Sequence, residues 1–336
     1  MPTPNRRIGP FEVASIGLGC MNLSHAYGTP PPADAAERLL LGALDAGVTL
    51  FDTAALYGFG TNETLVGRVL KLHRKRIVLC SKGGMTGQPV GPGGALQRVI
   101  DGRPVAIRRD CEASLQRLGT DVIDLYYLHR WDKRVPIEES VGAMARLKEE
   151  GKVRALGLSE VSAATLRKAH REHPIAAVQS EYSPWSRNVE IGVLQACRDI
   201  GAALVAFSPV ARGFLTATPP DPAAFDAKDI RRTMPRFEGP GYATNLALWR
   251  GVDHLARQAG CTPAQLSLAW LLARGDHVVP IPGTTQLAHV RENLAAAQVQ
   301  LPPGTSETLE DMLRAGRVQG ARYSAASQSE VDTEQF

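Results

Sequence analysis

Short apolar runs alternate with helix-like stretches eight times along the 336-residue chain, and this repeat constrains the fold most strongly. The runs are continuously apolar, as strands buried on both faces of a parallel sheet are. We expect strands at 15–18, 48–51, 77–80, 125–128, 153–158, 177–179, 203–207 and 278–281. Helices are expected at about 34–46, 63–70, 105–118, 137–150, 163–170, 191–200, 246–258, from 262 onward, and at 286–297. Repeated strand–helix units predict a (β/α)8 TIM barrel, with an open doubly wound sheet as the alternative.

The chain length fits a single barrel domain with insertions. A glycine-rich segment at 85–103 follows the third expected strand, and a segment rich in proline, arginine and aspartate at 211–244 follows the seventh. Long loops in a compact domain are usually functional or mobile. We therefore assign residues 1–323 to the barrel and expect the polar segment 324–336 to be a loose, flexible tail.

The charge and the cysteine content limit the kinds of binding partner and the cellular compartment that we expect. The 38 basic and 34 acidic residues give a net charge of +4, without the concentrated basic patch typical of nucleic-acid binding. Apolar runs stay below the roughly 18 residues of a membrane span. Five scattered cysteines without a C-x-x-C pair argue against structural zinc and a disulfide framework, and favour the cytoplasm. We expect no metal and a small-molecule substrate, and leave open a monomer or a homo-oligomer.

Reactive side chains follow three consecutive expected strands. Asp52 follows the second strand, Lys82 the third and His129 the fourth, and Tyr57 comes five residues after Asp52. Taken singly, each has an ordinary explanation, such as a helix cap or a packed core residue. Their coincidence at successive strand ends favours a functional interpretation, because the carboxyl ends of barrel strands carry the active site.

The segment from Gly17 to Asn22 has a G-x-G pattern but lacks the third glycine and the following helix of a dinucleotide fingerprint. We interpret it as the first barrel strand, ending in a tight turn near a ligand. Its candidate ligand contacts are Gly19, Cys20 and Met21.

Several motifs together resemble the aldo-keto reductase family. The segments are 51–58 (FDTAALYG) with Asn62 and Glu63, 81–82 (SK), 125–129 (LYYLH), 179–183 (QSEYS), 207–209 (FSP) with Gly213, and 281–285 (IPGTT) with Glu292 and Asn293. The likeness runs from about residue 15 to residue 293. It is greatest to bacterial short-loop aldehyde reductases and to the related potassium-channel β subunits.

The resemblance implies reversible, NADPH-dependent reduction of an aldehyde or ketone. It makes Tyr57 the general acid, has Lys82 lower the pKa of Tyr57, pairs Asp52 with Lys82, and lets His129 orient the carbonyl. Physical chemistry supports these roles, because a phenol near pKa 10 becomes a better acid beside an ammonium group. Hydrogen bonds to the developing oxyanion would stabilise the transition state.

The resemblance also implies a set of cofactor contacts. These are Gly19, Cys20, Met21, Asp52, Ser159, Gln179, Phe207, Ser208, Pro209, Val210, Gly213, Ile281, Gly283, Thr284, Thr285, Gln286, His289, Glu292 and Asn293. Two departures stand out: Glu160 replaces an asparagine common at the carboxamide, and Gln286 and His289 replace cations at the adenosine end. We expect NADPH, with NADH as the alternative.

The substrate pocket is expected from loop positions alone, with Tyr27, Trp131, Trp185 and Arg187 as its lining. Two other functions remain as alternatives. One is a slow-turnover, cofactor-binding regulatory subunit of the channel-β type. The other is a Schiff-base aldolase using Lys82, against which Asp52 argues because it should keep the amine charged.

Overall fold

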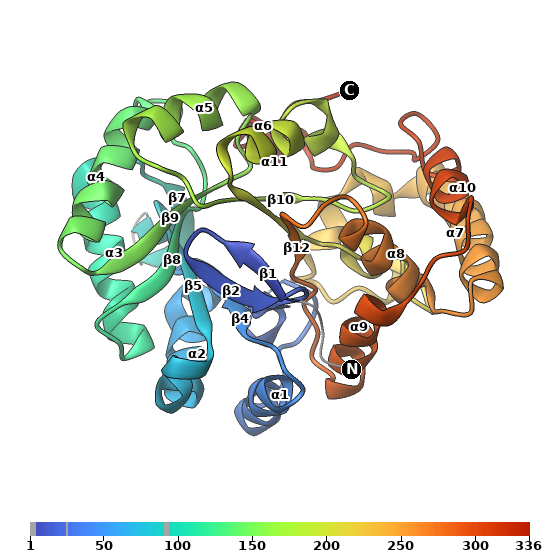
Figure 1. The fold of residues 1–336 in the computed structure, drawn as a ribbon, viewed down its shortest axis with the longest axis horizontal. Helices are drawn as coiled ribbons and strands as arrows, with labels where there is room; N and C mark the ends of the chain where they lie inside the picture. Colours follow the sequence, from blue (N-terminus) through green and yellow to red (C-terminus); the bar gives the residue numbers. More distant parts are fainter. Residues whose placement is uncertain (1–4, 25, 91–93) are drawn as a thin grey trace.

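The computed structural model describes residues 5–24, 26–90 and 94–336, so residues 91–93 of the expected insertion 85–103 lie outside the described part. Eight parallel strands form one curved sheet whose order follows the chain (Figure 1). They are β3 (Leu18–Gly19), β4 (Leu50–Asp52), β5 (Val78–Gly83), β8 (Ile123–Leu128), β9 (Val153–Ser159), β10 (Ala177–Glu181), β11 (Ala203–Phe207) and β12 (Val278–Pro280).

The first and last strands meet and close the sheet into a barrel. Gly19 bridges Gly283 in parallel, the amide of Gly17 donates to the carbonyl of Pro280 at 3.0 Å, and the amide of Gly19 donates to that of Pro282 at 3.2 Å. The predicted (β/α)8 barrel is confirmed, since an open doubly wound sheet would leave these strands unpaired.

Helices surround the strands on the outside (Figure 1). They are α1 (Ala33–Asp45), α2 (Thr61–Leu70), α3 (Pro104–Leu118), α4 (Ile137–Glu149), α5 (Ala163–Glu172), α6 (Val193–Ile200), α7 (Gly239–Gln258), α8 (Pro263–Leu272), α9 (Leu287–Ala295), α10 (Thr305–Met312) and α11 (Ala325–Ser329). Local sequence explains the ends: Thr262 and Gln265 form a capping box before α8, and Gly119 ends α3 at φ 61°. No helix in the described ranges has the length and apolarity needed to cross a membrane.

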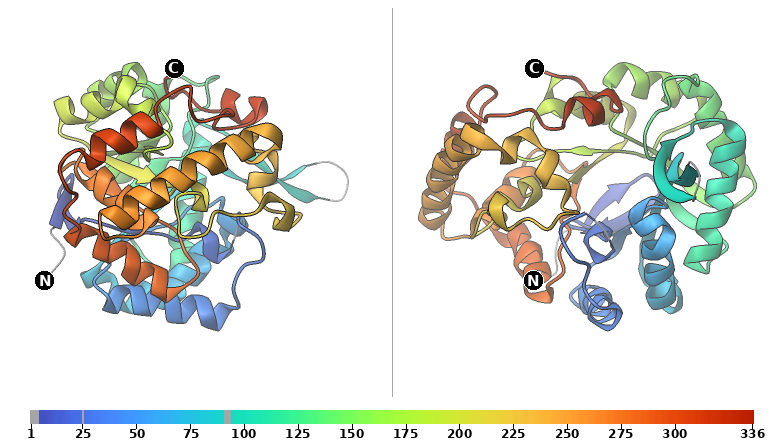
Figure 2. Two further views of the ribbon diagram at one scale, coloured as in Figure 1. Left: turned by 90° about the vertical axis from the view of Figure 1, so that its right-hand side faces the viewer. Right: turned by 180° about the vertical axis from the view of Figure 1, so that it is seen from behind.

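The barrel interior is sealed at the end opposite the reactive residues. The hairpin of β1 (Asn5–Ile8) and β2 (Phe11–Ala14) lies across that end, and its Ile8 and Val13 join the interior cluster of apolar side chains. Figure 2 shows this hairpin and the second hairpin, β6 (Met85–Val90) with β7 (Ala95–Ile100), at opposite ends of the barrel. The interior between this hairpin and the reactive residues is therefore filled by apolar side chains.

Three segments differ from the sequence expectations. Within the segment 85–103, residues 85–90 and 95–100 form the antiparallel β6–β7 ladder, with Met85 opposite Ile100. Helix α7 begins at Gly239, earlier than expected, with a proline in its first turn. The segment 324–336, expected to be loose, contains α11 and packs against the barrel, because Asp332 and Glu334 accept hydrogen bonds from the amides of Ser162 and Ala163 at the start of α5.

Candidate active site

The alternation of side chains along the strands brings the predicted residues together. Residues that fill the barrel interior, such as Leu50, Cys80 and Tyr127, lie two positions before Asp52, Lys82 and His129. Because strand side chains repeat every two residues, the polar residues extend the same inward-facing rows to the mouth of the barrel. The same spacing relates Ala177 to Gln179, Val205 to Phe207 and Val279 to Ile281.

Lys82 is the centre of the polar cluster. Its ammonium donates hydrogen bonds to the carboxylate of Asp52, to the carbonyl of Thr53 at 2.9 Å and to the hydroxyl of Tyr57 at 3.1 Å. The other oxygen of Asp52 accepts from Gln179 at 2.8 Å. Lys82 has no exposed surface, so its charge depends on these partners.

The electrostatics keep Lys82 protonated. Burial lowers the pKa of Lys82, but the carboxylate of Asp52 and the hydroxyl of Tyr57 outweigh burial and raise this pKa above its ordinary value. A permanently charged amine is not a nucleophile, so the structure argues against the Schiff-base alternative.

Tyr57 and His129 face each other edge to face, with ring centroids 5.8 Å apart. Burial raises the pKa of the Tyr57 hydroxyl, and Lys82 acts against this rise. The pKa of Tyr57 is therefore raised overall, whereas we expected Lys82 to lower it. The reason is that the Tyr57 ring lies almost wholly out of solvent, so that burial outweighs the effect of Lys82. Burial also lowers the pKa of His129 well below its usual value, helped by Arg130, Lys82 and Arg98. At neutral pH both groups are therefore uncharged hydrogen-bond donors.

A cavity of about 720 Å³ opens beside this cluster. Asp52, Tyr57 and His129 line it, and so do nearly all the predicted cofactor contacts. These are Gly19, Met21, Ser159, Gln179, Phe207, Ser208, Pro209, Val210, Gly213, Ile281, Gly283, Thr284, Thr285, Gln286, His289, Glu292 and Asn293. Cys20 is not among them, because it is fully buried, with its amide donating to the carbonyl of Asp52.

The segment after β11 has an unusual backbone. Ser208, Ala211 and Arg212 have positive φ values of 49°, 52° and 57°, and Gly213 has a φ of 90°. Such conformations cost energy for residues other than glycine and occur often at ligand sites. The hydroxyl of Ser267 in α8 donates to the carbonyl of Pro209 at 2.6 Å, which fixes this segment against the barrel.

Only one of the four residues expected to line the substrate pocket does so. Tyr27 lines the cavity, whereas Trp131, Trp185 and Arg187 do not. Trp131 donates to the carbonyl of Val135 within its own loop. Trp185 is buried against Phe214, with ring centroids 4.3 Å apart.

Arg187 pairs with Glu190 at 2.7 Å and is not part of the cavity lining. The structure does not bring these three residues to the cavity, because position after a strand does not fix the direction of a loop side chain.

Several lining residues were missed by the sequence interpretation. Arg98 comes from β7, Arg130 follows His129, and Tyr323, Ser327 and Glu330 come from the C-terminal segment. Adjacency to His129 was an available signal for Arg130. The other four reach the cavity through tertiary packing, which local patterns do not reveal.

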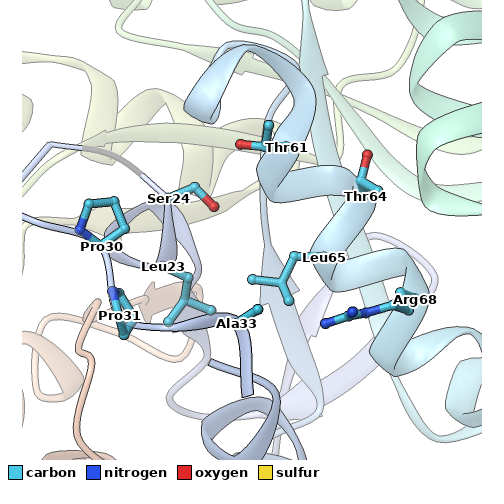
Figure 3. A pocket seen from close by; sticks show the side chains of 9 residues that line it. All are labelled: Leu23, Ser24, Pro30, Pro31, Ala33, Thr61, Thr64, Leu65 and Arg68. Carbon is cyan, nitrogen blue, oxygen red and sulfur yellow. The ribbon is translucent and has the colours of Figure 1, made fainter. Parts of the chain in front are cut away.

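A second hollow of about 370 Å³ lies between the segment before α1 and helix α2. In Figure 3, Leu23 and Leu65 point toward one another across it, and Arg68 lies at its edge. None of its lining residues belongs to the polar cluster or to the predicted cofactor set. It is therefore separate from the candidate active site.

Comparison with known proteins agrees with this geometry. The chain matches the aldo/keto reductase family model over residues 15–314. Aldo-keto reductase yakc of Schizosaccharomyces pombe, whose name specifies NADP(+), is 41% identical over 336 residues, covering 98% of this chain and 97% of the relative.

Two solved structures share the whole fold. The glycerol dehydrogenase of Gluconobacter oxydans has a TM-score of 0.83 at 28% identity, covering 93% of this chain and 96% of that chain. An aldo-keto reductase of Klebsiella pneumoniae in complex with NADPH has a TM-score of 0.71 at 28% identity, covering 96% and 100%.

A closed barrel with a buried Tyr–Lys–Asp cluster at its carboxyl edge defines a barrel oxidoreductase. The chain belongs to the aldo/keto reductase family. The resemblance inferred from the motifs is thereby confirmed.

Proposed function

We propose that this protein reduces an aldehyde or ketone with NADPH, and that Tyr57 supplies the proton. The observation that carries the proposal is the 3.1 Å contact between the ammonium of Lys82 and the hydroxyl of Tyr57, at a cavity lined by the residues expected to hold a nicotinamide.

The residues of the cavity fit a dinucleotide. Ser159 and Gln179 offer polar groups for a carboxamide, Phe207 offers an aromatic face, and Gly213 lets the backbone approach a phosphate closely. His129 has a buried Nδ1 atom without a hydrogen-bond partner among the described residues. The names of two relatives, one specifying NADP(+) and one a complex with NADPH, support the phosphorylated cofactor.

The bound dinucleotide would supply the hydride. His129 and Tyr57 would donate hydrogen bonds to the carbonyl oxygen, as in an oxyanion hole. As negative charge develops, Tyr57 would transfer its proton to that oxygen, since an alkoxide is a stronger base than a phenolate. Lys82 would stabilise the phenolate, and Asp52 would hold Lys82 charged and in place. The reverse sequence would oxidise an alcohol.

The adenosine end has an uncommon composition. Thr284, Thr285, Gln286 and His289 line it, and no lysine or arginine between residues 281 and 293 lines the cavity. Hydroxyl, amide and imidazole groups would then carry the contacts to a 2′-phosphate. The five free cysteines, four of them buried, support a reducing compartment such as the cytoplasm.

The direct test mixes the protein with NADPH and 4-nitrobenzaldehyde and follows the loss of reduced-nicotinamide absorbance. Turnover supports the proposal, and parallel titration with NADH decides the cofactor preference. Tight NADPH binding without turnover on a broad panel of carbonyl compounds would instead support the regulatory-subunit alternative.

A further inference from the structure

Arg130 is a cation at the cavity that the mechanism above does not use. It directly follows His129 after β8 and lines the cavity. Its Nη1 atom donates to the carbonyl of His129 at 2.7 Å and to the hydroxyl of Ser159 at 3.1 Å. These two contacts fix the guanidinium beside the carbonyl-reducing centre.

Arg130 differs from the other arginines of the cavity in its pairing. Four arginines line the cavity, and three of them have a carboxylate 2.6 Å away. The three pairs are Arg98 with Glu330, Arg212 with Glu181, and Arg231 with Asp229. Arg130 forms no salt bridge within 4.0 Å with any carboxylate of the described residues. Its only side-chain hydrogen bonds to these residues come from Nη1, which leaves Nε and Nη2 without an acceptor in the protein.

The position of Arg130 separates it from the expected phosphate contacts. Its hydrogen bond to Ser159 places it at the carboxamide end, whereas the segment 208–213 would surround the pyrophosphate. A free guanidinium fork matches a carboxylate in charge and geometry. Glu160 interacts electrostatically with Arg130, but its carboxylate is already bound by Arg322. A carboxylate in direct contact with the guanidinium of Arg130 would therefore come from the substrate.

We propose that Arg130 binds a carboxylate group on the carbonyl substrate, so that anionic aldehydes or ketones are preferred to neutral ones. This inference rests on the proposed function and names its substrate class. The electrostatic potential at the site is consistent with binding of an anion. The pKa of the neighbouring His129 is lowered first by burial and further by the positive charges of Arg130, Lys82 and Arg98. Two carboxylates in the cavity wall are paired with cations: Asp52 with Lys82, and Glu330 with Arg98. The third, Glu292, lies in α9 with the residues expected at the adenosine end and accepts a hydrogen bond from Thr262.

The test compares 3- and 4-formylbenzoate with their methyl esters, using NADPH and measuring kcat/KM. The wild type should favour at least one acid over its ester. Arg130→Gln should lower this acid-to-ester ratio roughly 10- to 100-fold, the loss of one charge-assisted contact. Arg130→Lys should keep part of the preference. Arg134→Gln, in the same loop but exposed and outside the cavity, should leave the ratio unchanged.

The ratio separates substrate binding from a structural role. If Arg130→Gln lowers kcat/KM equally for acid and ester, Arg130 only positions Ser159 and the inference is overturned. A wild type without any preference for the acids would overturn it too. If no carbonyl compound turns over, the proposed function fails, and calorimetry decides the inference: 4-formylbenzoate should bind the NADP(+) complex of the wild type about 10-fold or more tightly than that of Arg130→Gln.

Discussion

Arg322 and Glu160 form a buried bidentate ion pair that joins the C-terminal segment to the loop after β9. Nη1 of Arg322 lies 2.9 Å from Oε1 of Glu160, and Nη2 lies 2.6 Å from Oε2. The same carboxylate accepts from the amide of Glu181 and from the hydroxyl of Thr333. The position at which many relatives are expected to carry a carboxamide-binding asparagine therefore anchors the end of this chain, which explains why the expected loose tail is packed.

Arg322→Met should destabilise the fold, because it leaves the Glu160 carboxylate buried without its counter-charge. We expect a loss of roughly 3–5 kcal/mol in the free energy of unfolding, measured by urea denaturation. Adding Glu160→Gln to Arg322→Met should recover much of that loss. Arg317→Met, a half-exposed arginine nearby in sequence, should change the stability by less than about 0.5 kcal/mol. Equal stability of Arg322→Met and wild type would contradict the anchoring role.

The ion pair of Glu160 should also make the stability of the fold depend on pH. Burial raises the pKa of its carboxyl, but the charge of Arg322 and its hydrogen bonds outweigh burial and bring this pKa from 4.5 to about 2. Because folding lowers the pKa, the stabilisation is complete above about pH 4.5 and is lost as the pH falls towards about 2. The difference in unfolding free energy between wild type and Glu160→Gln should therefore shrink between those two values. A difference independent of pH would show that the carboxylate is not paired in solution.

Tyr57→Phe removes the proposed acid while keeping the ring. Turnover should fall by about 10²- to 10⁴-fold, the typical contribution of general acid–base catalysis. The dissociation constant for NADPH, measured by fluorescence titration, should change little. Tyr126→Phe is a matched control, since the Tyr126 hydroxyl is buried and has no hydrogen-bond partner in the described structure. A Tyr57→Phe enzyme with normal turnover would exclude Tyr57 as the acid.

Lys82→Met should shift the pH profile as well as lower the rate. Oxidation of an alcohol needs Tyr57 as phenolate, and Lys82 acts to lower the pKa of Tyr57. Without the ammonium this pKa should rise, so the low-pH limb of the kcat profile for oxidation, along which the rate increases with pH, should move to higher pH. Adding Asp52→Asn would limit the structural damage from an unpaired buried carboxylate. An unmoved limb in the double variant would mean that Lys82 does not tune Tyr57.

The barrel and the polar cluster could be predicted from local sequence patterns. Runs such as 125–128 predicted a buried strand, and two-residue alternation carries Tyr127 and His129 to the same side. That rule applies only while the chain stays extended. Trp131 also lies two residues after His129, but it follows a bend and bonds within its own loop.

Contacts between residues far apart in the sequence could not be predicted. The partner of Glu160 lies 162 residues later in the chain, and many other arginines could have served. The register of the β6–β7 hairpin could not be predicted from its glycine-rich sequence, because strands without a clear hydrophobic pattern specify their pairing weakly. Residues brought to the cavity by these segments, including Arg98 and Glu330, were missed for the same reason.

The ion pair between Arg98 and Glu330 links the β6–β7 hairpin to the C-terminal segment at the cavity wall. Their atoms are 2.6 Å apart, and the side chains are 43% and 28% exposed, so the pair should contribute no more than about 1 kcal/mol to stability. Glu330→Gln would release Arg98 as a second unpaired cation in the cavity that Arg130 lines. We expect the acid-to-ester ratio of kcat/KM for the formylbenzoates to rise about two- to fivefold at low salt and to return towards wild type near 1 M salt, where screening is short-ranged. Glu307→Gln, outside the cavity, is the control. A ratio that falls in Glu330→Gln would show instead that the pair holds the wall in shape, with its charge playing no part in substrate choice.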